Sequence, residues 1–401
     1  MSPVLPFDIL TVIIDIVEEN KDTDLLKELA LVSHSFLHIC REHLFATVEL
    51  NSSSYLTESP KRAFVKLLES NPDVVKYIRK LTYIVTYGLT PNDHDRQLSV
   101  IFLNSLPKFS RLNCLAISAA NLDWNTLDSS LTSAFIHLMH LPTINHIDLS
   151  HILNFPLSSL SLSVNLLRLD IFHLKLHNSP KEDFPEIVEE MIPKIREFHT
   201  SGSSQLTRKL LHAERQDGQP AFNFIDLKRL SMSFNGLGDK RNIEYLFQNA
   251  KILEELHLTV VHGSSLAGIL SPSARTLKVL DLSVSICDRK SSIDLGGICE
   301  ELEALAGQNI LETLFLIVHV FSLRTEDFVG SRIQQVEKVL VKPGWSMLRQ
   351  VSLNVSIARY AAARKMCKML QSLPDKYLSR LSNLESVAFD YSVHVADSST
   401  I

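Results

Sequence analysis

Histidine pairs, glutamate clusters and glycine-containing turns are the parts of this sequence that could support chemistry. His137 and His140 lie three residues apart in a segment with helical character, so both imidazoles could face one side of a helix and bind a metal ion. No third ligand follows nearby, and a partly exposed helix face is the simpler interpretation. Two groups of glutamates have helical spacing, which is more typical of a solvated face than of an acid–base pair: Glu186, Glu189 and Glu190, and Glu300, Glu301 and Glu303.

The sequence motifs of several common enzyme classes are absent. No phosphate-binding GxxxxGK, dinucleotide-binding GxGxxG, hydrolase GxSxG or zinc-protease HExxH pattern occurs. The segment 236–238 is interpreted as a turn between a strand and a helix, and 202–204 as part of a polar loop. We therefore predict that the chain is not an enzyme and holds no cofactor or metal. The alternative is an enzyme whose site these patterns miss, which clustered, perturbed ionisable groups in a deep pocket would indicate.

Composition excludes a few partner classes. A formal charge of -5 over 401 residues gives no electrostatic reason to expect binding to nucleic acid or to an anionic membrane. No stretch approaches the roughly 18 uninterrupted apolar residues of a membrane span. The five cysteines are far apart and form no CxxC pair: Cys40, Cys114, Cys287, Cys299 and Cys367. Isolated cysteines in odd number favour reduced thiols, and so a cytoplasmic or nuclear protein.

One pattern, apolar-x-x-apolar-x-apolar, returns along most of the chain. The matches are Leu112-Leu115-Ile117, Ile144-Ile147-Leu149, Leu166-Leu169-Ile171, a weaker Ile195-Phe198-Thr200, Leu227-Leu230-Met232, Leu253-Leu256-Leu258, Leu277-Leu280-Leu282, Leu311-Leu314-Leu316, Leu348-Val351-Leu353 and Leu384-Val387-Phe389. Leu157-Leu160-Leu162 also fits, but it lies too close to its neighbours to be a full unit. The spacing of about 22 to about 37 residues is that of leucine-rich repeats and their longer irregular forms.

Each match predicts a short strand whose last two apolar positions face one side. A single unit cannot bury that face, so neighbouring units must stack. Helical stretches are predicted between the strands, at 98–106, 131–141, 185–192, 243–249, 331–341 and 357–373. Because strand, helix and strand alternate, we predict a parallel sheet on the concave face with helices outside. The alternative is a doubly wound α/β sheet, but there both faces are covered and strands read as continuous apolar runs. Here they are half polar.

The first fifty residues have a different character. An apolar helical run reaches Val17, a second begins near Leu25, and a third ends in Leu44-Phe45 before a strand-like segment at 46–50. Ile9, Val12, Ile13, Ile16 and Val17 form one stripe at helical spacing, which Leu10 and Ile14 widen. A unit this small with so much apolar surface is usually covered by the rest of the chain or by a partner.

This stretch resembles an F-box, in particular the F-box-like segments of large fungal families that end in a His-Leu-Phe element. The matching residues are Leu5-Pro6, Ile9-Leu10, Ile13, Leu25-Leu26, Leu29, Val32-Ser33, Phe36, Cys40 and Leu44-Phe45. Asp8 stands where the family usually has Glu, and Phe36 where it most often has Trp. The resemblance covers roughly an eighth of the chain. It implies docking onto Skp1, the adaptor of a cullin-based (SCF-type) ubiquitin ligase, with repeats that hold the target protein.

The predicted architecture is therefore α/β: an N-terminal three-helix F-box (1–50), a helical linker (51–80), irregular leucine-rich repeats (81–395) and a polar tail (396–401). The residues expected to bind Skp1 are Leu5, Pro6, Ile9, Leu10, Ile13, Leu29, Val32 and Phe36. Two alternatives stay open: the helical segment could be a cap that buries the end of the repeats, and the repeats could be an interaction scaffold without a ligase role.

The expected target surface is the concave face of the sheet. It consists of residues between and after the core positions: Ser118, Asp148, Ser150, Asp170, Phe172, His199, Ser231, Ser233, His257, Thr259, Asp281, Ser283, Phe315, Ile317, Ser352, Asn354 and Asp390. Phe172, His257, Phe315 and Ile317 are the candidate target contacts, because an apolar side chain on an exposed strand face can anchor a partner. Polar insertions at 86–96 and 201–223 could fold over this face or extend from its rim.

Overall fold

The computed structural model describes residues 6–51, 60–85, 93–176, 184, 191–234, 237–260, 270, 275–286, 296–320, 326–358 and 363–395. The chain forms two compact units, one of residues 1–193 with 214–221 and one of residues 194–213 with 222–401. Each unit combines a parallel β-sheet with helices. Within the part of the chain that is described, no helix has the length and apolar character to cross a bilayer.

The first unit begins with three helices and continues as alternating strands and helices. Its elements are α1 (Phe7–Glu19), α2 (Thr23–Ala30), α3 (His34–Leu44), β1 (Thr47–Asn51), α4 (Pro60–Ser70), η1 (Pro72–Tyr77), β2 (Lys80–Val85), α5 (Asp93–Ser105), η2 (Leu106–Lys108), β3 (Cys114–Asp123), η3 (Trp124–Thr126), α6 (Ser129–Met139), β4 (His146–Leu153), η4 (Leu157–Leu162) and β5 (Arg168–Phe172).

The second unit repeats the same alternation. Its elements are β6 (Glu197–Ser201), α7 (Ser204–Leu211), β7 (Arg229–Phe234), α8 (Leu237–Asn249), β8 (Glu255–Val260), β9 (Val279–Ile286), α9 (Gly296–Leu305), β10 (Thr313–Val320), α10 (Glu326–Leu340), β11 (Gln350–Ile357), α11 (Ala363–Leu370), α12 (Leu373–Tyr377), α13 (Ser379–Ser382) and β12 (Ala388–Val395).

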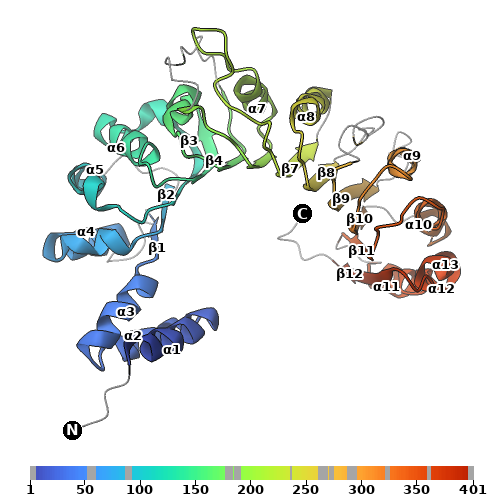
Figure 1. Ribbon diagram of the computed structural model, residues 1–401, viewed down its shortest axis with the longest axis horizontal. Helices are drawn as coiled ribbons and strands as arrows, with labels where there is room; N and C mark the ends of the chain where they lie inside the picture. Colours follow the sequence, from blue (N-terminus) through green and yellow to red (C-terminus); the bar gives the residue numbers. More distant parts are fainter. Residues whose placement is uncertain are drawn as a thin grey trace. The chain divides into compact units, whose positions relative to one another are not determined.

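In both units the strands follow one another in sequence order, and every described pair is parallel. In each unit the helices that follow β1 lie along one face of the sheet, whereas α1–α3 lie beyond β1 at the end of the first unit (Figure 1). We call the other face, which carries no described helix, the open face. Sequential order without a reversal, and helices on one side only, contradict the doubly wound alternative. The predicted α/β fold with a parallel sheet and helices on one side is confirmed as solenoid-like.

The repeated apolar pattern builds the core between sheet and helices. In the nine matches from Leu112 to Leu353, all three positions are buried, with exposed fractions of 4% or less. The tenth match, at the terminal strand β12, is only half-buried. A terminal repeat has a neighbour on one side only, so its apolar positions are less covered. The match at 157–162, which was not counted as a full repeat unit, forms the 3₁₀ helix η4 rather than a strand.

Several predicted boundaries differ from the structure. β1 pairs with β2 in parallel, so the sheet begins inside the segment assigned to the helical domain. The segment 201–223, predicted as a polar insertion, contains α7, whose Leu206, Leu210 and Leu211 are buried. The helix predicted at 357–373 begins later, because β11 extends to Ile357. Residues 185–190 of the predicted helix at 185–192 and most of the insertion at 86–96 lie outside the described residues.

Two glutamates of the second unit are buried rather than solvated. Glu301, one of the helical-spacing group, is 2% exposed and its Oε2 accepts a hydrogen bond from the Leu270 backbone N–H at 2.8 Å. Glu337 on α10 is 5% exposed, and its Oε1 accepts from the N–H groups of Arg380 and Leu381 at 2.8 and 3.2 Å. Both carboxylates satisfy backbone donors that no helix or sheet bond uses.

Replacing Glu337 with alanine is expected to lower the free energy of unfolding by about 2 kcal/mol, because the buried Leu381 N–H and the partly buried Arg380 N–H lose their acceptor. Chemical denaturation of the full chain measures the change. Glu303→Ala is the matched control, since Glu303 on α9 forms only a half-exposed ion pair with Lys342. Equal effects of the two substitutions would contradict a structural role for Glu337.

Candidate docking surfaces and a polar network

Local sequence signals set the boundaries of the three N-terminal helices. The Asp22 side chain caps α2 by accepting from the Leu25 N–H at 3.0 Å, and the Ser33 side chain caps α3 by accepting from the Phe36 N–H at 3.3 Å. The helices pack around a small shared core: Leu10, Ile14, Val17, Leu26, Ala30, Ile39 and Cys40, with Leu29, Phe36, Leu37 and Leu44 against it. The three helices therefore form a packed three-helix bundle within the first unit.

Helix α1 presents apolar residues on two opposite sides. Leu10, Ile14 and Val17 point into the core. Ile9, Val12 and Ile16, at helical spacing i, i+3 and i+7, are 46%, 56% and 53% exposed. We call these three residues the α1 stripe. A second apolar group lies where α2 leads into α3, with Leu31 87% and Val32 65% exposed.

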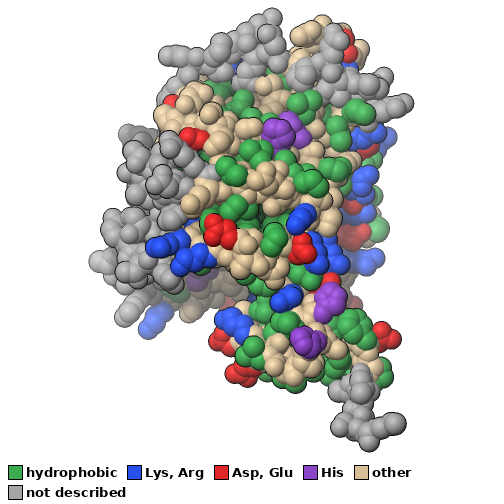
Figure 2. Space-filling model, turned by 90° about the vertical axis from the view of Figure 1, so that its left-hand side faces the viewer, with side chains coloured by type: hydrophobic (Ala, Val, Ile, Leu, Met, Phe, Trp, Pro, Cys, Tyr) green, Lys and Arg blue, Asp and Glu red, His purple; other side chains and the backbone are tan. Residues whose placement is uncertain are grey.

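The charged side chains on helix α1 itself are all negative. Helix α1 contains Asp8, Asp15, Glu18 and Glu19 and no lysine or arginine. Figure 2 shows hydrophobic side chains at the surface of the helical part, at the bottom of the view, next to acidic side chains. A stripe of three large, roughly half-exposed side chains on one helix is the type of surface that a partner usually covers.

The open face of the sheet carries the residues predicted from the repeat pattern. In the second unit, His257, Asp281 and Phe315 lie in one register row across β8, β9 and β10, and Ile317 follows Phe315 by two residues. His257 Nδ1 lies 3.0 Å from Asp281 Oδ2, and this hydrogen bond raises the pKa of the imidazole above its ordinary value despite partial burial. Three of the four candidate target contacts thus lie on β8 and β10, the two strands that flank β9, while Phe172 belongs to the first unit.

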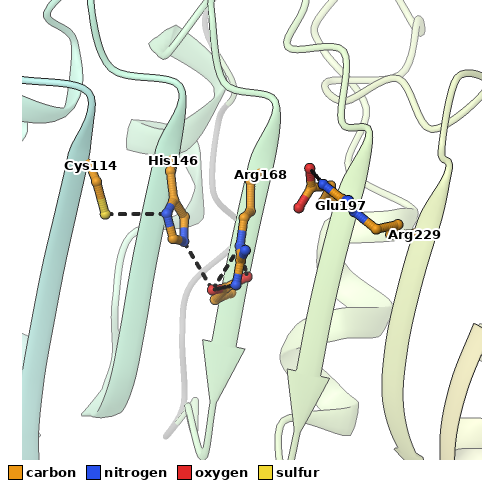
Figure 3. Close-up of polar contacts among 6 residues, drawn as sticks. Cys114, His146, Arg168, Glu197 and Arg229 are labelled. Carbon is orange, nitrogen blue, oxygen red and sulfur yellow. Dashed lines mark hydrogen bonds and ion pairs between the residues drawn. The ribbon is translucent and has the colours of Figure 1, made fainter. Parts of the chain in front are cut away.

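A polar network crosses β3, β4 and β5 on the open face of the first unit (Figure 3). Cys114 Sγ lies 3.2 Å from His146 Nδ1, and His146 Nε2 lies 2.9 Å from Asp170 Oδ2. Arg168 donates from Nε and Nη2 to the same carboxylate at 2.9 to 3.1 Å. Asp170 was expected on the exposed target surface, but it is 3% exposed, because the imidazole and the guanidinium contact its carboxylate.

The electrostatics of this network favour a protonated imidazole. Burial alone would lower the pKa of His146, but its hydrogen bonds to Asp170 and Cys114, and their charges, raise it to about 9. Burial, and then the charge of Asp170, raise the pKa of Asp148 on the same strand. At neutral pH both ring nitrogens of His146 therefore carry hydrogen, and the ring donates to the sulfur and to the carboxylate.

No family model matches this chain, and no curated protein matches it. Its candidate sites therefore depend on the geometry of its own residues.

The predicted Skp1-binding residues do not all lie on one exposed surface. Pro6, Ile9 and Val32 are exposed. Ile13, Leu29 and Phe36 are half-buried, and the last two pack against the helical core. Leu10 was predicted to face the partner, but it is 7% exposed and part of that core, so it cannot contact a partner without unfolding. Leu5 lies outside the described residues. Val12 and Ile16 were in the sequence stripe but not among the predicted contacts.

The suspected histidine pair does not form a metal site. His137 Nδ1 lies 2.7 Å from the Ser133 carbonyl oxygen, whereas His140 Nε2 lies 2.8 Å from the carbonyl oxygen of Ser159, so the two rings have separate partners. Burial lowers the pKa of His140. Across the described ranges, no three candidate ligand residues come together to hold a metal ion.

The free energy of unfolding is expected to fall as pH rises from about 6.5 to about 9. The folded-state pKa of His146 is above its unfolded value, so its contribution is complete below about pH 6.5 and is lost as pH passes about 9. The magnitude is on the order of 3 kcal/mol at most. Denaturation of wild type and His146→Gln across this range isolates the effect, because other titrating groups are common to both. The same slope in the two proteins would contradict it.

Proposed function

We propose that the chain is a substrate receptor of an SCF-type ubiquitin ligase, in which α1–α3 form an F-box that docks a Skp1-like adaptor and, through it, a cullin. The observation that supports this most is the α1 stripe. A helix that only capped the repeats would bury its apolar residues against the chain, whereas Ile9, Val12 and Ile16 are about half exposed among the described residues. These exposed side chains need a partner, and the F-box resemblance of the same segment identifies the class of partner.

The remainder of the chain is proposed to be an irregular array of leucine-rich repeats that holds a target protein. The buried pattern positions, the sequential parallel strands and the helix-free open face support this assignment. In the second unit, Phe315 and Ile317 on β10 are the proposed apolar contacts, with His257 and Asp281 beside them.

A receptor of this kind needs no catalytic residues of its own. It raises the effective concentration of the target near the ubiquitin-carrying enzyme, so its contribution is binding and geometry. The two binding surfaces should therefore be separable by substitution.

The experiment is affinity capture of the full chain followed by mass spectrometry for a Skp1-like adaptor and a cullin. We expect both with wild type and neither with Ile9→Asp. Phe315→Asp should keep both, because β10 is not part of the three-helix bundle α1–α3. Wild-type protein that recovers no adaptor at micromolar concentration would reject the ligase assignment. The repeats would then be better explained as an interaction scaffold.

A further inference from the structure

Three groups with complementary chemistry meet on the open face of the first unit, from three different strands. Cys114 supplies a sulfur nucleophile, His146 lies within hydrogen-bond distance of that sulfur, and Asp170 lies within hydrogen-bond distance of the other ring nitrogen. Nucleophile, proton-transfer group and a third group that orients it form the general arrangement of an activated thiol. Two bonds from Arg168 Nε and one from Nη2 hold the carboxylate in place.

The other described cysteines have no such partners. Burial raises the pKa of the Cys40 thiol, and burial together with the charges of Glu303 and Glu300 raises that of Cys299 to about 11. Cys367 is half-buried, and its sulfur lies 3.8 Å from the carbonyl oxygen of Val393. Cys114 is therefore the one described cysteine whose sulfur has a cationic hydrogen-bond donor, and such a donor stabilises a thiolate.

We propose that Cys114 is a nucleophile whose sulfur is activated by the adjacent His146 ring, and that this site reacts with small hydroperoxides. The thiolate sulfur attacks one oxygen of hydrogen peroxide, so that an S–O bond forms and the O–O bond breaks. The sulfur is oxidised by two electrons to a sulfenic acid, and the peroxide is reduced. The second oxygen leaves as hydroxide and takes the proton from His146 Nδ1, giving water and a neutral imidazole.

Burial selects the size of the reactant. Cys114 is 7% exposed on the strand face, so a reagent as small as hydrogen peroxide can reach the sulfur more readily than a disulfide-containing peptide or a second protein. Asp170 acts as a positioning residue, because it contacts the imidazole and not the sulfur. The proposal is independent of adaptor docking, since it depends only on β3, β4 and β5.

The test treats the full wild-type chain with hydrogen peroxide, traps sulfenic acid with dimedone and measures labelling at each cysteine by mass spectrometry. Because His146 lies beside the sulfur, where it favours the reacting thiolate and can donate a proton to the leaving oxygen, we expect Cys114 to react about tenfold faster than Cys299 or Cys367. A rate at Cys114 equal to or below that at Cys367 would overturn the proposal.

Substitutions distinguish activation of the Cys114 sulfur by His146 from a contact that is only structural. At neutral pH the labelling rate of Cys114 should be about tenfold lower in His146→Gln than in wild type, because glutamine supplies neither a cationic hydrogen bond nor the proton for the leaving oxygen, while labelling of Cys299 and Cys367 should stay the same. The charged groups beside this pair are Lys80 on β2, Asp148 on β4, and Arg168 and Asp170 on β5, and they are unchanged in His146→Gln. Asp170→Asn should give an intermediate rate. A Cys114 labelling rate that His146→Gln leaves unchanged, in protein that circular dichroism shows to be folded, would contradict activation by the imidazole. The comparison of Cys114 with Cys367 in wild type tests the proposal even if a variant does not fold.

Discussion

Replacing Val12 with aspartate is expected to weaken binding of a Skp1-like adaptor by about 30-fold or more, while the melting temperature of the chain stays unchanged. Val12 is 56% exposed at the centre of the α1 stripe, between Ile9 and Ile16. A charge placed there would be desolvated by a docked partner, and truncating or charging a central contact typically costs 2 kcal/mol or more of binding free energy. Titration calorimetry with the purified adaptor measures the change.

The chain offers a closely matched control. Val100 on α5 is 54% exposed and also lies within a helix, but outside the three-helix bundle α1–α3. Val100→Asp should leave the adaptor affinity unchanged. Leu10→Asp, in contrast, places a charge in the core of α1–α3 and should lose adaptor binding together with the helical fold. If Val12→Asp and Val100→Asp bind the adaptor equally well, the α1 stripe is not the docking surface.

Replacing Asp170 with alanine is expected to lower the free energy of unfolding by about 3 kcal/mol. The Asp170 side chain is 5% exposed and pairs with both His146 and Arg168. Its removal leaves two partly buried cations, His146 and Arg168, without their carboxylate, and the loss of one partner of such a network is strongly destabilising. Chemical denaturation followed by circular dichroism measures the loss.

Asp390 on β12 provides the comparison for this substitution. It is exposed, and its carboxylate has only a long 3.4 Å contact with the Ser352 hydroxyl. Asp390→Ala should change the free energy of unfolding by less than about 0.5 kcal/mol. A similarly small effect of Asp170→Ala would mean that the carboxylate does not hold the network together.

The repeat pattern predicted most of the sheet because burial in this fold is strictly periodic. Each match places one residue in the turn and two on the buried side of a strand, so the core follows from sequence spacing alone. The segment 46–50 was predicted to be strand-like, but it was assigned to the helical domain because it follows directly after three helices, whereas β1 belongs to the sheet. Its neighbour β2 carries Leu81 and Tyr83 on the buried side, and β1 pairs with it in register.

The polar network could not be recognised by a local motif, because its members are 32 and 24 residues apart. A usable signal was nevertheless present. Cys114, His146 and Arg168 each stand immediately before the second apolar position of their repeats, so stacking the repeats in register aligns them. Which side chains bond one another depends on rotamers and on the depth of Asp170, and spacing does not specify these.

Helical spacing alone also could not separate buried from solvated glutamates. Glu301 and Glu303 belong to the same cluster, yet only Glu301 faces a backbone N–H from a distant segment. For α1, spacing predicted an apolar stripe but not which part the helical core would use. The core takes Leu10, Ile14 and Val17, and the side left over is the α1 stripe.

The most direct test of the central proposal is a titration of a purified Skp1-like adaptor into the wild-type chain. Docking by α1–α3 predicts saturable binding with one adaptor per chain and a dissociation constant of about 1 μM or tighter. It also predicts slower amide hydrogen exchange in α1 when the adaptor is bound. An absence of binding at about 50 μM, or binding that leaves exchange in α1 unchanged, would contradict it.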